Sequence, residues 1–270
     1  MGSAPLNLTS RAATVTPAVP RSRLTCIYTL VMASGRSAVL IHGGRQGGWL
    51  WVRVTPLLRS AGWDVYAPTL SGLADRAHLL TPAIDLATHI EDVRALLKFQ
   101  DLHDVVLVGH SYGGMVITAL CETDALPRIA ELVYLDALIP RPGDSAFDLM
   151  PHELTASIRE AVAGEGDGWR VPGRTGGVFG LTDPADVAWA GARLTDQSAA
   201  TYTDTLRSDT AASSLPRHFI RFTDPALIPD HVVDRARLDP TWTYAEVAAP
   251  HGGALSHPNE VARAILAAVQ

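Results

Sequence analysis

The stretch that decides the fold is Val105-Val106-Leu107-Val108-Gly109-His110-Ser111-Tyr112-Gly113-Gly114. Its four leading apolar residues predict a strand that is covered on both faces, as in a parallel sheet. The pattern G-x-S-x-G follows at Gly109 to Gly113, and an apolar run then predicts a helix over 112–122. A serine in such a tight strand-to-helix turn presents its hydroxyl at the carboxyl edge of the sheet. The sequence therefore predicts Ser111 as a nucleophile.

The same alternation of short apolar runs and amphipathic helices continues on both sides of this turn. Because the connections are short, it predicts an α/β fold with a mostly parallel sheet flanked by helices. Residues 139–215 break the rhythm with many Gly, Ala, Asp and Pro residues, and are expected to form a helical cap insertion. The predicted strands lie at 38–41, 63–67, 105–108, 132–135, 217–222 and 244–248, and the predicted helices at 51–61, 86–97, 112–122 and 261–269.

The first residues are harder to assign. Residues 1–23 look like a flexible tail ahead of one domain over 24–270, because prolines stand there among small polar residues. Residues 24–32 faintly resemble the apolar part of a signal peptide, but their β-branched residues favour a first strand. That interpretation predicts a cytoplasmic enzyme. Residues 1–31 are alternatively an upstream extension that contributes little to the fold.

Composition excludes several classes of function. The hydrophobic share of 47% is that of a globular protein, and the net charge of −6 comes without a basic block that could bind nucleic acid. The chain holds no run of 18 apolar residues, so no membrane partner is expected. Cys26 and Cys121 fit neither a disulfide framework nor a metal site. Because zinc, P-loop and dinucleotide motifs are also absent, we expect no metal and no cofactor.

A serine hydroxyl needs a neighbouring base before it can attack a carbonyl. Of the ten histidines, only His251 and His257 fall between the last predicted strand and the last predicted helix, where the chain order serine, acid, histidine puts the base. His251 lies closer to the strand end, in a Gly-containing loop, whereas His257 stands beside Pro258 and is typical of a helix boundary. We therefore expect His251 to be the base.

Three motifs in order resemble the α/β-hydrolase superfamily, and the resemblance runs from about Ser37 to the end of the chain. The run His42-Gly43-Gly44-Arg45-Gln46-Gly47-Gly48-Trp49, the Ser-Tyr-Gly-Gly at 111–114 and the late Ser256-His257-Pro258 are similar to the branch of plant-type methylesterases and hydroxynitrile lyases with their bacterial relatives. Pro250 departs from the Gly or Asp that the family usually has before its histidine. The resembling lyases have a lysine where this chain has Gly252, which argues against lyase chemistry.

Negative charge on the attacked carbonyl oxygen must be met by fixed donors. The amide of Tyr112, directly after the nucleophile, is one candidate at a helix N-terminus, where the helix dipole helps. The resemblance implies Gly44, in the family's oxyanion loop, as the second donor.

Two aspartates can serve as the acid that orients His251. Asp224 follows the strand at 217–222, where the family's acid usually falls, and is the preferred candidate. Asp136 ends the strand at 132–135, where some members of the family have theirs, and is the alternative acid. Asp230 is more simply a helix N-cap.

The expected function is that of a serine esterase that cleaves a small carboxylic ester through an acyl-enzyme on Ser111. The expected partner is thus a small-molecule ester, and association into a homodimer is left open. A ligand-binding protein without turnover, or a biosynthetic cyclase or lactone-forming enzyme, remains an alternative because fold does not fix function. The cap aromatics either line a pocket for a modest apolar group or pack the cap onto the core; they are Trp169, Phe179, Trp189 and Tyr202.

Overall fold

The computed structural model describes residues 1–2, 35–174 and 179–270. The chain divides into a unit Met1–Ser34 and a unit Gly35–Gln270, and everything that follows concerns the second unit. The tail predicted over 1–23 and the strand predicted over 24–32 lie outside the described residues.

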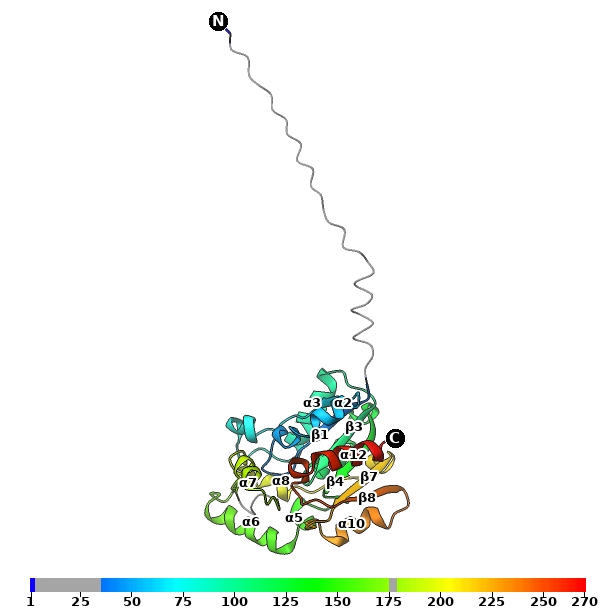
Figure 1. Cartoon of the computed structure of the whole chain (residues 1–270). Coiled ribbons are helices and arrows are strands. Elements are labelled where there is room, and N and C mark those ends of the chain that lie inside the picture. The colour runs from blue at the N-terminus through cyan, green and yellow to red at the C-terminus, as the bar shows by residue number, and fades with distance from the viewer. Residues whose placement is uncertain (3–34, 175–178) are drawn as a thin grey trace. The chain divides into compact units, whose positions relative to one another are not determined.

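The second unit is built on a parallel sheet with the strand order β2-β1-β3-β4-β7-β8 (Figure 1). Every neighbouring pair in this sheet is parallel, which confirms the predicted α/β fold class. Each strand overlaps a run that the sequence predicted. The bounds are β1 Ser37–Ile41, β2 Asp64–Tyr66, β3 Val105–His110, β4 Ile129–Leu135, β7 Arg217–Phe222 and β8 Trp242–Val247.

The sheet is covered on both faces because successive strand residues point to opposite sides. In β1, Val39 and Ile41 enter one apolar cluster while Ala38 and Leu40 enter the other, and all four are fully buried. The first cluster is closed by α3 (Leu86–Phe99), α4 (Gly113–Leu120) and α10 (Asp230–Arg237). The second is closed by α2 (Thr55–Ser60), α11 (Gly253–Ser256) and α12 (Pro258–Ala268).

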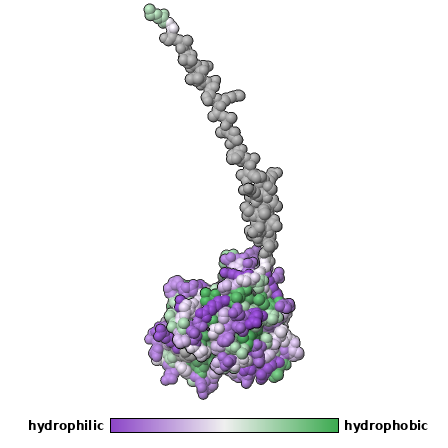
Figure 2. Space-filling view, viewed as in Figure 1, coloured by the Kyte–Doolittle hydropathy of each residue, from purple (hydrophilic) through white to green (hydrophobic). Residues whose placement is uncertain are grey.

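The outer sides of these helices are polar. On α12, which lies in front of the sheet in Figure 1, Asn259, Glu260 and Arg263 are exposed while Val261 and Ile265 are buried. In the same view, Figure 2 shows a surface on which hydrophilic residues predominate between smaller hydrophobic areas.

Local signals set the helix ends. Asp85 caps α3, because its carboxylate accepts a hydrogen bond from the Thr88 amide at 2.8 Å. The single helix predicted over 51–61 is in fact two pieces, a 3₁₀ turn η1 (Gly48–Trp51) and α2. Pro56 explains the division, since proline lacks an N–H and is favoured in the first turn of a new helix. Two further 3₁₀ turns are η2 (Ala74–Leu79) and η3 (Leu126–Arg128).

The segment between β4 and β7, which we call the cap, contains short helices and one small antiparallel ribbon. The ribbon pairs β5 (Arg170–Val171) with β6 (Gln197–Ser198). In Figure 1, α5, α6, α7 and α8 gather at one end of the sheet. The helices of the cap are α5 (Ala146–Leu149), α6 (His152–Gly164), α7 (Pro184–Gly191), α8 (Ala200–Thr203) and α9 (Thr210–Ser213).

Candidate active site

Ser111 occupies the tight turn between β3 and α4. Its φ of 53° lies in the left-handed region, which is uncommon for a residue with a side chain. The turn closes only because its flanking residues are glycines: a Cβ at Gly109 would lie 2.7 Å from the Gly113 carbonyl oxygen, and a Cβ at Gly113 would lie 2.8 Å from that of Ile41. The half-buried Ser111 side chain thus projects from the carboxyl edge of the sheet, as the motif predicted.

His251 follows β8 and pairs with Asp136, which directly follows β4. The Nδ1 of His251 lies 2.6 Å from Oδ2 of Asp136, and both side chains are buried. The other carboxylate oxygen of Asp136 accepts a hydrogen bond from the Phe222 amide at 3.1 Å. Asp136 has a φ of 43°, a conformation that aspartate tolerates better than most residues. The carboxylate is therefore held from two sides.

Asp224, the preferred partner of His251 in the sequence, does not contact it. The Asp224 side chain is exposed, and its amide donates to the Ala249 carbonyl at 3.0 Å, which prolongs the pairing of β7 with β8. Asp224 itself stands in a turn two residues after the end of β7, and its side chain is exposed to solvent. The contact with His251 that the sequence predicts for Asp224 is made in the structure by the alternative residue, Asp136.

His110 ties the nucleophile turn to the histidine loop. Its Nε2 lies 2.9 Å from the carbonyl oxygen of His251, and the two imidazole rings are 4.5 Å apart. Burial lowers the pKa of His110 well below its usual value, so the ring is neutral and Nε2–H is the donor. Because His110 adjoins Ser111, this bond fixes Ser111 relative to His251.

His42 and His257 have other surroundings. The His42 ring is fully buried; its Nε2 accepts from the Leu70 amide at 3.1 Å, and its Nδ1 lies 2.8 Å from the Gly43 carbonyl oxygen. Burial lowers its pKa to about 4, which leaves it neutral. His257 is half-buried at the start of α12, where its Nδ1 lies 2.8 Å from the Ser256 hydroxyl. Neither ring is paired with a carboxylate.

The loop after β1 approaches the Ser111 turn, since a Cβ at Gly43 would lie 2.9 Å from the Cβ of Ser111. On either side of Gly44, the Gly43 amide donates to Oε1 of Gln46 at 2.9 Å, and the Arg45 amide donates to Oε1 of Gln197 at 2.6 Å. Within the described part of the chain, the amides of Gly44 and Tyr112 have no hydrogen-bond acceptor. Two fixed donors of this kind are what a developing oxyanion requires.

The cap covers this loop with Tyr202. A Cβ at position 44 would overlap the Tyr202 hydroxyl, so only glycine fits beneath it. The Tyr202 ring stacks on Phe147 at 5.3 Å and lies 5.8 Å from the Tyr112 ring. Burial raises the pKa of Tyr202, so its phenol stays protonated.

The cap aromatics divide between the two expected roles. Phe179 reaches the site, with its ring 5.8 Å from the His251 ring, whereas Trp189 packs the cap onto the core against Trp49 at 5.5 Å. A surface cleft of about 760 Å³ between α3 and residues 204–208 is lined by neither Ser111 nor His251. Together with Tyr202, these contacts place the candidate site beneath the cap.

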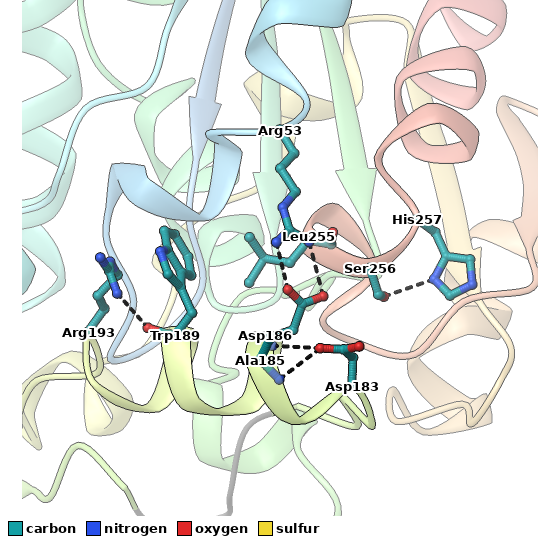
Figure 3. Close-up of polar contacts among 9 residues, drawn as sticks. All are labelled: Arg53, Asp183, Ala185, Asp186, Trp189, Arg193, Leu255, Ser256 and His257. Atoms are coloured by element: carbon teal, nitrogen blue, oxygen red, sulfur yellow. Dashed lines mark hydrogen bonds and ion pairs between the residues drawn. The ribbon is translucent and has the colours of Figure 1, made fainter.

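One arginine fastens the cap to the core (Figure 3). Arg53 forms two hydrogen bonds to the Asp186 carboxylate of α7, at 2.6 and 3.0 Å, and one to the Leu255 carbonyl oxygen at 2.6 Å. Asp183 caps α7 by accepting from the amides of Ala185 and Asp186. Through these contacts Arg53 joins the first turn of α7 to α11.

Two of the site's neighbours were not anticipated from the sequence. Gln197 and Arg45 carry no recognisable motif of their own, and the position of Arg45 directly after Gly44 was the only available signal. Across residues 35–174 and 179–270, no group of three or more His, Cys, Asp or Glu side chains could hold a metal ion. In the same residues, no helix has the length and apolar character needed to cross a membrane.

Comparisons with known proteins agree with this architecture. The carbendazim hydrolyzing esterase of Nocardioides sp. (strain SG-4G) is 45% identical over 126 residues, which are 47% of this chain and 52% of that protein. The polyneuridine aldehyde esterase of Rauvolfia serpentina is 34% identical over 108 residues, 40% of each chain. The matched part thus spans about half the length of these relatives or less. Plant proteins named methylesterase and hydroxynitrile lyase also occur among the relatives, which confirms the resemblance to that branch.

A solved structure shares the fold over most of the chain. The extracellular alpha/beta-hydrolase from a Paenibacillus species superposes with a TM-score of 0.74 over 87% of this chain and 99% of that one, at 24% identity. The sequence profile of the alpha/beta hydrolase family matches residues 38–264. This chain therefore belongs to the alpha/beta hydrolase family.

Proposed function

We propose that this protein is a serine esterase that cleaves a small carboxylic ester through an acyl-enzyme. Ser111 attacks the ester carbonyl, His251 takes the serine proton and passes it to the leaving alcohol, and a water then releases the acid by the reverse sequence. The amides of Gly44 and Tyr112 hold the oxyanion in both steps. The observation that carries the proposal is the buried contact of 2.6 Å between His251 and Asp136 beside the Ser111 turn.

The orientation of His251 follows from this contact. Because the Asp136 carboxylate can only accept, the proton of the neutral imidazole resides on Nδ1, which leaves the Nε2 lone pair to act as the base. Asp136 then stabilises the imidazolium that forms during attack. The bond from the Phe222 amide keeps the carboxylate in place throughout.

The relatives support ester hydrolysis as the reaction class. Two of them are named esterases, the carbendazim hydrolyzing esterase and polyneuridine aldehyde esterase, and a third is named a pyrethroid hydrolase. We extend to this chain only the cleavage of an ester bond with a modest acyl or alcohol group. A cytoplasmic location belongs to the same proposal.

The test compares two serines, each beside a histidine. Wild type, Ser111→Ala and Ser256→Ala are assayed on p-nitrophenyl acetate, and Ser256 is the matched control because it contacts His257 instead of His251. We expect Ser111→Ala to lose about 10³-fold or more in kcat and Ser256→Ala to keep wild-type turnover. Labelling with a fluorophosphonate should add one adduct to wild type and none to Ser111→Ala, as measured by intact-protein mass spectrometry.

Equal rates for wild type and Ser111→Ala would refute the esterase proposal. A wild-type protein that turns over no ester in a broad panel would favour the ligand-binding alternative instead.

A further inference from the structure

Arg45 is a buried cation in the oxyanion loop. The residue is only 3% exposed and has a φ of 61°, so both its backbone and its side chain are held in an unusual state. Among the described residues its buried Nε has no hydrogen-bond partner, and the bond from its Nη1 to the Gly173 carbonyl oxygen is long at 3.4 Å. Arginine is rarely buried this fully unless a carboxylate or another anion pairs with it.

The described part of the chain supplies no such anion at Arg45. Within the described ranges, no Asp or Glu forms an ion pair with Arg45. Asp196 lies close by, since it accepts from the Gly173 amide at 2.9 Å, but its other oxygen is engaged by Arg170 at 2.6 Å. An unpaired buried charge is strongly unfavourable, so an arginine at this position calls for a partner from outside the chain.

The Arg45 cation lies beside the proposed catalytic groups. Its guanidinium carbon is 5.2 Å from the centre of the Phe179 ring, and that ring lies 5.8 Å from the His251 ring. The same positive charge opposes the burial effect on the pKa of Tyr202, whose hydroxyl lies over Gly44. Phe179 thus contacts both the cation and the imidazole, and Arg45 directly follows Gly44, a proposed oxyanion donor.

We propose that Arg45 is a specificity residue that binds an anionic group, a carboxylate, on the ester substrate. The inference rests on the proposed function and names its substrate class: an ester that carries a second, ionised acid remote from the bond that is cleaved. A planar guanidinium whose Nε–H has no partner suits a carboxylate, and the covered site strengthens the pairing by excluding water. The carboxylate belongs either to the acyl half or to the alcohol half of the ester.

Two sets of probe esters distinguish a carboxylate on the acyl half from one on the alcohol half. For the acyl half, the mono-p-nitrophenyl esters of glutaric, adipic and pimelic acids are compared with p-nitrophenyl pentanoate, hexanoate and heptanoate. For the alcohol half, para-acetoxybenzoate is compared with its methyl ester. We expect wild type to prefer the anionic member in one series, and Arg45→Met to lower kcat/KM for that member by about 10²-fold. The neutral member should change by less than about threefold.

Two further variants control for charge and for folding. Arg45→Lys retains the charge without the planar fork and should fall between wild type and Arg45→Met. Arg193→Gln removes an exposed cap arginine that stacks on Trp189 at 4.0 Å, and should leave the preference unchanged. If Arg45→Met fails to fold, the Arg45→Lys comparison and the wild-type preference carry the test.

A binding measurement separates this inference from the proposed function. Adipate should raise the melting temperature of Ser111→Ala, if the acyl half carries the charge, and para-hydroxybenzoate should do so in the other case; neither should stabilise Ser111→Ala/Arg45→Met. Ser111-dependent ester hydrolysis without any Arg45-dependent preference would overturn the inference and leave the esterase intact. Loss of Ser111 without effect on hydrolysis would instead overturn the proposed function.

Discussion

The exchange Asp136→Asn tests the proposed mechanism most sharply. In the folded protein one carboxylate oxygen accepts from the Phe222 amide and the other faces Nδ1 of His251. An asparagine must keep its carbonyl oxygen toward the Phe222 N–H, because its NH₂ cannot accept that bond. Its NH₂ then faces His251 and donates to Nδ1, which moves the imidazole proton to Nε2. The base that Ser111 needs is thereby blocked.

The expected loss is about 10⁴-fold in kcat, equivalent to about 5 kcal/mol of transition-state stabilisation. Both hydrogen bonds of residue 136 persist in this variant, so we expect its urea midpoint to stay near that of wild type. Asp224→Asn is the matched control: an exposed side chain at that position should change kcat by no more than about twofold. The assay is p-nitrophenyl acetate turnover with active sites titrated by the fluorophosphonate.

A larger loss of kcat in Asp224→Asn than in Asp136→Asn would refute this mechanism. If Asp224→Asn abolished turnover while Asp136→Asn retained it, the buried contact would have no catalytic role. Mild effects of both exchanges would mean that His251 is not the base.

Other expectations concern the oxyanion loop, acid stability and the cap. Gly44→Ala should lower kcat by about 10²-fold, because the new Cβ would overlap the Tyr202 hydroxyl and displace the amide; Tyr202→Phe in the same chain should restore part of the rate. The burial of His42 lowers its pKa from 6.5 to about 4, so between these pH values the imidazole is protonated in the unfolded chain and neutral in the folded one. The free energy of unfolding should therefore be constant with respect to His42 above pH 6.5 and decrease by up to about 3 kcal/mol as the pH falls from 6.5 to 4. In urea titrations, His42→Gln should abolish this decrease. Arg53→Gln should lower that free energy by about 1 kcal/mol, since its ion pair with Asp186 is partly solvated, and should speed proteolysis within the cap.

The fold could be predicted because its signals are local. A run of four apolar residues such as 105–108 can only be satisfied when both faces are covered, and β3 is buried along its whole length. The glycines around Ser111 likewise report a backbone requirement that no other residue meets. Such features depend only on residues that are close in the chain, so they can be predicted from the sequence alone.

The partner of His251 could not be settled in the same way. Asp136 and Asp224 both follow strands that end at one edge of the sheet, so chain order allows either. Asp136 follows β4 directly with a positive φ, whereas Asp224 lies in a turn two residues after β7. The sequence does not show which of these two turns brings its carboxylate to His251. Arg45 was missed for a related reason: what distinguishes it is the lack of a partner in space, which a sequence does not record.

The contact between His251 and Asp136 also has a consequence for how the protein assembles. The two residues are 115 positions apart, whereas Ser111 and Asp136 sit at the ends of the adjacent strands β3 and β4. During refolding, the nucleophile and the acid can come together before the cap and the last strands arrive, because their pairing closes only a short loop. The base joins only when β8 docks on β7. Under the proposed mechanism, the rate at which ester hydrolysis returns during refolding therefore measures the final docking step. It should be slower than the change of any spectroscopic signal that reports the pairing of β3 with β4.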